Sequence, residues 1–163
     1  MNLILCGMMG SGKTTVGLKV AELSGKTHCD TDDLVVEKYG EIAKIFAKHG
    51  EAVFRERETE IVKTLSDKDG LVISSGGGLV LKEENVALLK KNGRICYLRA
   101  DVTTLEKRLA NDETRPLLKN KDAIKTLTEK RAPVYESVAD FIVDVDGKTP
   151  EGVAKEILSL IQK

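Results

Sequence analysis

The chain has 163 residues, of which 41% are hydrophobic and 32% charged, and Lys plus Arg balance Asp plus Glu at 26 each. This length fits one domain whose core holds without disulfides or metals. Proteins that bind nucleic-acid phosphates or anionic lipid usually carry a basic excess, so the neutral balance argues against both partners. No apolar stretch is as long as a membrane span, and no leader-like or coiled-coil pattern is visible. We therefore expect a cytoplasmic monomer.

Strand-like runs alternate with segments of helical spacing along the chain. Strands are expected at residues 2–6, 27–30, 71–75, 94–98 and 141–145. Helices are expected at residues 13–23, at residues 82–91 and from Pro150 onward, where Thr149 is a cap. This alternation predicts an α/β fold with a parallel sheet covered by helices on both faces.

Two segments interrupt the alternation within this single expected domain, residues 1–163. Residues 32–66 have helical character, broken near Gly40 and Gly50, and we interpret them as an inserted substrate-binding segment. Residues 111–122 are polar and join two expected helices, and we interpret them as a lid.

The cysteines and histidines show no pattern of a metal or disulfide site. Cys6, Cys29 and Cys96 are odd in number and far apart, which fits neither a disulfide framework nor a zinc site. Cys6 and Cys96 lie in apolar runs, so we expect buried, reduced thiols there. His28 and His49 have no partner pattern, and the sequence assigns them no role.

The most specific stretch is GMMGSGKT at residues 7–14, which matches the phosphate-loop pattern G-x-x-x-x-G-K-[ST] between an expected strand and an expected helix. Glycines allow backbone N–H groups to turn inward around an anion, and the helix N-terminus adds positive potential. Lys13 can reach the β- and γ-phosphates, and the Thr14 hydroxyl can bind magnesium. The stretch predicts a nucleoside triphosphate held by Gly10, Ser11, Gly12, Lys13, Thr14 and Thr15.

Two fragments typical of GTPases occur outside their proper context. Residues 67–70 read D-x-x-G but precede a strand instead of following one, and residues 120–122 are one residue short of N-K-x-D. We interpret both as chance matches in polar turns.

Acidic residues follow the second expected strand and not the third. The strand at residues 71–75 runs into Gly76, Gly77 and Gly78, where many phosphate-loop enzymes carry a metal-supporting aspartate. Asp30, Asp32 and Asp33 instead lie at the carboxyl end of the second strand, the usual ligand side of a parallel sheet. A helix cap at Asp30 or Thr31 explains one of these residues but not three acids. The glycines form either a flexible turn or a close approach to a ligand, and we favour the ligand.

With this loop, DTDD, GEAVFRERE, SSGGGLV, TRPLL and RAPVYESVAD in this order, the chain resembles the shikimate kinase family over nearly all its length. The resemblance implies a three-layer α/β/α P-loop fold with a five-stranded parallel sheet, a substrate-binding segment and a lid. It also implies that the ATP γ-phosphoryl group is transferred to the 3-hydroxyl of shikimate, on the route to aromatic amino acids, with Mg²⁺ as cofactor.

On the acceptor side, the resemblance implies that Asp32 binds the substrate hydroxyls and either orients or deprotonates the one attacked. Further implied roles are a carboxylate grip by Arg55 and Arg131, orientation of Arg55 by Glu58, backbone contact with the ring by Gly76, Gly77 and Gly78, and a pocket wall at Phe46 and Phe54. Arginine's planar fork suits a carboxylate better than lysine does. Considered alone, Arg55 fits a solvated helix charge equally well.

On the donor side, the resemblance implies that Thr14 binds magnesium directly and Asp30 supports it through water. Lys13 and Arg115, the lid arginine, would stabilise charge on the transferring group, although Arg115 also fits an idle surface residue. Implied adenine contacts are Arg108, Lys148 and Pro150. Two other functions stay open: a gluconate or nucleoside-monophosphate kinase, and a catalytically silent nucleotide-binding module.

Overall fold

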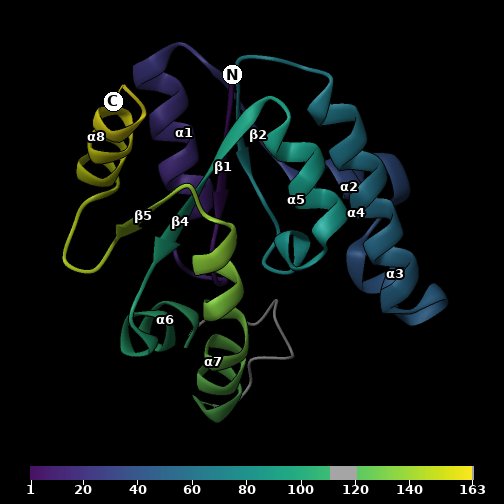
Figure 1. Ribbon diagram of the computed structural model, residues 1–163. Helices are drawn as coiled ribbons and strands as arrows, with labels where there is room; N and C mark the ends of the chain where they lie inside the picture. The colour runs from purple at the N-terminus through teal and green to yellow at the C-terminus, as the bar shows by residue number, and fades with distance from the viewer. Residues whose placement is uncertain (111–120, 163) are drawn as a thin grey trace.

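A sheet of five parallel strands runs through the computed structural model, which describes residues 1–110 and 121–162 (Figure 1). The strand order is β2-β3-β1-β4-β5. The strands are β1 (Asn2–Cys6), β2 (Thr27–Asp30), β3 (Leu71–Ser74), β4 (Gly93–Arg99) and β5 (Phe141–Asp144). The predicted five-stranded parallel sheet is therefore confirmed.

The central position of β1 follows from its composition. All five of its residues, NLILC, are buried, and a strand covered on both faces is expected to read as a continuous apolar run. It pairs with β3 on one side and β4 on the other, so that Leu3 lies opposite both Val72 and Arg94. The segment after β1 consequently opens at the middle of the sheet's carboxyl edge.

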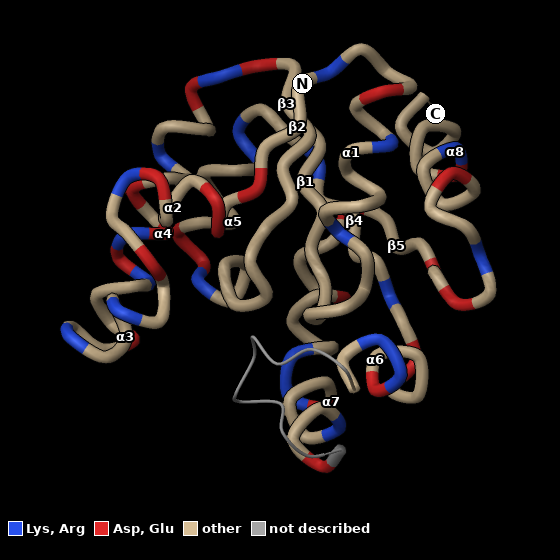
Figure 2. The backbone as a smooth tube through the Cα atoms, turned by 180° about the vertical axis from the view of Figure 1, so that it is seen from behind, with Lys and Arg blue, Asp and Glu red and all other residues tan. Residues whose placement is uncertain are grey.

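Helices cover both faces of the sheet. α1 and α8 pack side by side on one face, while α4 and α5 pack together on the other, and α6 and α7 lie beyond the carboxyl ends of the strands (Figure 1). The helices are α1 (Lys13–Ser24), α2 (Thr31–Tyr39), α3 (Ile42–His49), α4 (Glu51–Ser66), α5 (Glu83–Lys90), α6 (Val102–Leu109), α7 (Lys121–Val138) and α8 (Pro150–Ile161). Figure 2 shows Lys and Arg interspersed with Asp and Glu along α4, α6 and α7.

Helix boundaries follow their caps. α8 begins as expected, with Thr149 Oγ1 accepting a hydrogen bond from the Gly152 N–H and Pro150 in the first turn. The helix expected at residues 82–91 instead begins at Glu83, because the Lys82 backbone is extended and a short 3₁₀ turn, η1 (Leu79–Leu81), precedes it. β3 ends at Ser74, one residue earlier than expected.

The long excursion at residues 32–66 consists of three helices, α2, α3 and α4, and the breaks lie at Gly40 and Gly50 as expected. Asp30 caps α2 by accepting from the N–H groups of Asp32 and Asp33. Of the predicted lid, residues 111–120 lie outside the described part, and its last two residues begin α7.

Cys6 and Cys96 are buried and free, as expected, and burial raises the pKa of the Cys6 thiol to about 12. Among the described helices, none is both long enough and apolar enough to cross a membrane.

Because Leu3 lies in the core of the sheet and Leu18 lies on the surface, substituting them should affect stability differently. Leu3 on β1 is 2% exposed, whereas Leu18 on α1 is 54% exposed. We expect Leu3→Ala to lower the free energy of unfolding by about 2–5 kcal/mol, because it leaves a cavity in the central layer. Leu18→Ala, the matched control, should change it by less than about 0.5 kcal/mol. Urea unfolding followed by circular dichroism measures both, and equal losses would contradict the assigned core.

Candidate active site

The phosphate loop connects β1 to α1 at the centre of the sheet's carboxyl edge. Gly10 and Gly12 have φ angles of 84° and 97°, a left-handed conformation that a side chain would disfavour. The Lys13 ammonium donates a hydrogen bond to the Gly7 carbonyl at 2.6 Å, so this side chain folds back over the loop. Ser11 Oγ is buried and has no hydrogen-bond partner among the described residues. The loop is thus a compact turn with a cation at its opening.

Thr14 and Asp30 meet at the edge of this loop. The Thr14 hydroxyl donates to Asp30 Oδ2 at 2.9 Å, while the other oxygen of the same carboxylate caps α2. A hydroxyl and a carboxylate side by side are oxygen ligands of the kind that Mg²⁺ prefers. The donor set therefore fits a hard cation, and Asp30 is both a helix cap and a member of the site.

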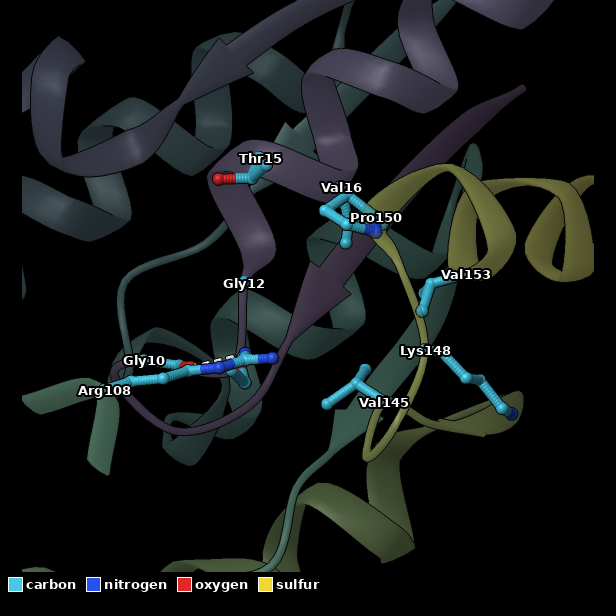
Figure 3. Close-up of a pocket in the computed structure, with 10 residues that line it drawn as sticks. Gly10, Gly12, Thr15, Val16, Arg108, Val145, Lys148, Pro150 and Val153 are labelled. Carbon is cyan, nitrogen blue, oxygen red and sulfur yellow. Dashed lines mark hydrogen bonds between the residues drawn. The ribbon is translucent and has the colours of Figure 1, made fainter. Parts of the chain in front are cut away.

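A cavity of about 320 Å³ lies beside the phosphate loop (Figure 3). Its lining includes four of the predicted loop residues, Gly10, Ser11, Gly12 and Thr15. Arg108 from α6, Lys148 from the segment between β5 and α8, and Pro150 at the start of α8 also line it. The remaining apolar lining was not predicted from the sequence and consists of Val16, Val145 and Val153. No sequence signal separates these valines from ordinary core positions.

The two basic residues of this cavity are placed differently. Arg108 donates to the Gly10 carbonyl at 2.9 Å and lies against the loop (Figure 3). Lys148 extends away from the loop in the same view, and its ammonium pairs with Glu156 at 2.9 Å. The stem of Lys148 therefore contributes to the wall, while its charge is directed elsewhere.

The three glycines after β3 each face a charged side chain from another element. A Cβ atom on Gly76 would lie 2.7 Å from Asp32 Oδ1. On Gly77 it would lie 3.0 Å from an Arg131 guanidinium nitrogen, and on Gly78 it would lie 2.5 Å from the Arg55 guanidinium. Side chains here would displace all three groups, so the glycines serve close packing of charged residues. The structure thus brings together Asp32, Arg55 and Arg131 around this glycine segment.

Glu58 holds Arg55 in this arrangement. Its Oε1 accepts from the Arg55 guanidinium at 2.6 Å, one turn away on α4. Glu58 is 1% exposed, and burial raises the pKa of its carboxyl, while the neighbouring Arg55 opposes that rise. Its Oε2 has no partner among the described residues and faces Gly76. Glu58 thus fixes the position of the Arg55 guanidinium through this ion pair.

Phe46 and Phe54 form an aromatic wall next to these groups. Their ring centroids are 5.0 Å apart, and the Arg55 guanidinium carbon lies 5.1 Å from the Phe54 ring centre. Phe54 is buried and Phe46 is half-buried. The pair therefore packs beside Arg55 from α3 and α4.

Tyr135 was not predicted to belong to the site. Its hydroxyl donates to the Gly77 carbonyl at 2.5 Å, and its ring, which is fully buried, packs 5.1 Å from that of Tyr97. The spacing of Arg131 and Tyr135 is a usable signal, because residues four apart share one face of a helix. That face of α7 is turned toward the glycines.

Of the remaining predicted residues, one is exposed to solvent and the other is outside the described part of the chain. Asp33 is exposed, so only Asp30 and Asp32 of the acidic cluster face the site. Arg115 lies outside the described residues.

A phosphate loop after the central strand, facing an acid and two arginines from other elements, defines a P-loop kinase. The family model for shikimate kinase matches residues 9–162. Shikimate kinase of Caldicellulosiruptor bescii is 45% identical to this chain, and the match covers 98% of this chain and 94% of that protein. Shikimate kinase of Thermodesulfovibrio yellowstonii is 44% identical, and the match covers 96% of this chain and 92% of that protein. The solved structure of shikimate kinase from Acinetobacter baumannii in complex with shikimate superimposes with a TM-score of 0.93 at 36% identity, with 99% and 92% covered. The chain belongs to the shikimate kinase family.

The Tyr135 hydrogen bond predicts a stability change. Tyr135→Phe removes the donor to the Gly77 carbonyl in a buried setting, and we expect the free energy of unfolding to fall by about 1–3 kcal/mol. Tyr39→Phe is the control, because its half-buried ring makes no hydroxyl hydrogen bond among the described residues. This substitution should change stability by less than about 0.5 kcal/mol. Denaturant unfolding of both variants measures the difference. Equal stability of the parent and Tyr135→Phe would mean that this bond does not hold the glycine segment.

Proposed function

We propose that this chain transfers the γ-phosphoryl group of ATP to the 3-hydroxyl of shikimate, giving 3-phosphoshikimate and ADP. The single observation that carries the proposal is the packing of Asp32, Arg131 and Arg55 against Gly76, Gly77 and Gly78, across from the phosphate loop. Membership of the shikimate kinase family supports the same reaction.

The acceptor would bind between the glycines and the charged groups around them. Two guanidinium groups beside adjacent glycines, those of Arg131 and Arg55, suit a carboxylate, because the planar fork can donate two parallel hydrogen bonds. Asp32 would receive the hydroxyls, and the backbone of Gly76 to Gly78 would lie against the ring. Phe46 and Phe54, with Glu58 behind Arg55, would complete the wall. An acid at one end and cations at the other match a small polyol that carries one carboxylate.

ATP would occupy the phosphate loop, with its base in the neighbouring cavity against Arg108, Pro150 and the stem of Lys148. The backbone of Gly10 to Thr15 would hold the phosphates at the N-terminus of α1. Magnesium would be held by Thr14 directly and by Asp30 through water, and it would offset charge on the phosphates. Lys13 would exchange its bond to the Gly7 carbonyl for the β- and γ-phosphates.

In the reaction, the bond between the shikimate O3 and the γ-phosphorus forms as the bond from that phosphorus to the β,γ-bridging oxygen breaks. The hydroxyl proton leaves toward Asp32, which orients the hydroxyl. Because the transition state is loose, positioning and charge stabilisation supply most of the rate. Lys13 and Arg115 would carry that stabilisation.

The segment at residues 32–66 would hold the acceptor, and residues 111–122 would act as a lid over the phosphates within a single kinase domain, 1–163. Closure would exclude water and so limit hydrolysis of ATP. The balanced charge of the chain, 26 basic and 26 acidic residues, argues against a nucleic-acid or membrane partner. A cytoplasmic monomer is part of the same proposal.

The acceptor is tested by coupling ADP release to NADH oxidation in the presence of Mg²⁺ and ATP. We expect turnover with shikimate and only background rates with gluconate, AMP or CMP. Shikimate holds its hydroxyls and its carboxylate at fixed positions on a ring, whereas gluconate is a flexible open chain that must lose more conformational freedom on binding, and AMP and CMP carry a phosphate instead of a carboxylate. Turnover with a different acceptor would replace the proposal. ADP binding without any transfer would identify a silent nucleotide-binding module.

Two variants test the division between acceptor and donor. Asp32→Asn should reduce transfer at least about 100-fold while the Kd for ADP stays within about twofold, because positioning of the hydroxyl is lost and the phosphate loop is intact. Arg131→Ala should raise the KM for shikimate by about 30-fold or more, as expected when one partner of a desolvated charge pair is removed.

Arg94→Ala is the matched control for Arg131→Ala. Arg94 packs over the Phe141 ring near the start of β4, at the opposite end of the strand from the site. The Arg94→Ala substitution should leave the KM for shikimate and the KM for ATP unchanged. Loss of ADP affinity in Asp32→Asn or Arg131→Ala, with acceptor binding preserved, would reverse the assigned roles.

A further inference from the structure

A histidine with no part in the proposed chemistry connects the sheet to the helix that follows the phosphate loop. His28 on β2 and Ser74 on β3 direct their side chains toward α1, and His28 Nε2 lies 2.8 Å from Ser74 Oγ. The Ser74 hydroxyl in turn donates to the backbone carbonyl of Lys13 at 2.8 Å. Two hydrogen bonds therefore lead from β2 through β3 to the first residue of α1.

The direction of both hydrogen bonds follows from the acceptor at their end. A carbonyl oxygen can only accept, so the single hydroxyl hydrogen of Ser74 is used on Lys13. Ser74 Oγ must then accept from His28, which requires the hydrogen on Nε2. We call this pair the His28–Ser74 clamp.

Gly17 allows the clamp to reach the helix. A Cβ atom on Gly17 would lie 2.6 Å from Ser74 Oγ and 2.9 Å from His28 Nε2, which are distances that real Cβ atoms do not tolerate. In a regular α-helix the N–H of residue 17 also bonds to the carbonyl of residue 13. The clamp, Gly17 and the Lys13 carbonyl therefore meet at one point between α1 and the sheet.

The first turn of α1 is the part of the helix that would contact a nucleotide. It carries the side chains of Lys13 and Thr14, and Ser74 bonds to the backbone of the first of these. A displacement of this turn would move the ammonium and the hydroxyl together, and small displacements of binding groups have large effects on phosphoryl transfer.

We propose that His28 is a positioning residue for nucleotide binding, and that it acts through Ser74 to hold the first turn of α1 in place under the phosphates. This inference rests on the proposed binding of ATP at the phosphate loop. The competing explanation is ordinary packing, in which His28 and Ser74 contribute to stability but not selectively to nucleotide affinity.

The test uses purified full-length variants and ADP with Mg²⁺ as the probe, titrated calorimetrically well below every variant's melting temperature. His28→Leu and Ser74→Ala each break the connection and should raise the Kd for ADP by about fivefold to tenfold, which is the ratio expected if the free energy of one part-buried hydrogen bond is expressed in nucleotide binding. His28→Gln places an amide N–H near the position of Nε2 and should stay within about twofold of the parent.

Gly17→Ala and Ser137→Ala complete the set. Gly17→Ala keeps both clamp residues, but the added Cβ would push the side chains of His28 and Ser74 away from α1. It should therefore raise the Kd for ADP as His28→Leu does. Ser137→Ala is the control for Ser74→Ala, because within the described part of the chain its exposed hydroxyl bonds only to the Val134 carbonyl in α7. It should leave the affinity unchanged.

A double-mutant cycle tests whether His28 and Ser74 act as one unit. If they do, His28→Leu/Ser74→Ala should weaken ADP binding no more than the more severe single variant. Multiplication of the two single effects would contradict the clamp. The KM for ATP should rise in the variants while the KM for shikimate stays constant, which a general loss of stability does not produce.

Unchanged ADP affinity in His28→Leu, accompanied by a lower melting temperature, would overturn the inference in favour of packing. Failure of the proposed function gives a different result: the parent would bind ADP but release none in the presence of shikimate, and the ADP titrations would still decide the role of His28.

Discussion

The arrangement of the site depends on the absence of side chains at Gly76, Gly77 and Gly78. Each glycine leaves the space that one charged group occupies: Asp32 from α2, Arg131 from α7 and Arg55 from α4. A Cβ on Gly76 or Gly78 would displace Asp32 or Arg55, and a Cβ on Gly77 would require Arg131 to shift by a few tenths of an ångström. Three helices from two separate parts of the chain, α2 and α4 before β3 and α7 after β4, therefore converge on one short segment.

The strand before these glycines connects the acceptor side to the phosphate loop. Ser75 donates to the Leu5 carbonyl on β1, and Ser74 donates to that of Lys13. The Gly76 N–H donates to Thr31 Oγ1 at the start of α2. Many phosphate-loop proteins carry an acid at the end of this strand. This chain instead has the hydroxyl groups of Ser74 and Ser75, which hold backbone carbonyls in place. The acid is supplied by β2, where Asp30 meets Thr14.

Much of the fold and of the site could be predicted, because the patterns that reveal them are local. Continuous apolar runs such as Asn2–Cys6 identify strands covered on both faces. The phosphate loop follows from residue types at fixed spacing, and Arg55 with Glu58 follows from a family motif. The start of α5 was predicted too early, because apolar spacing does not reveal the extended backbone at Lys82.

By itself the sequence determined which residues could carry chemistry: the phosphate loop, the acids of DTDD, and Arg55 and Arg131. Only the tertiary structure decided which of them meet, and what holds them. Asp33 is exposed although its neighbour Asp32 faces Gly76, Tyr135 bonds to Gly77, and His28 reaches α1 through Ser74. The physical reason is that such contacts join strands and helices 40 to 60 residues apart, where sequence spacing carries no information about distance.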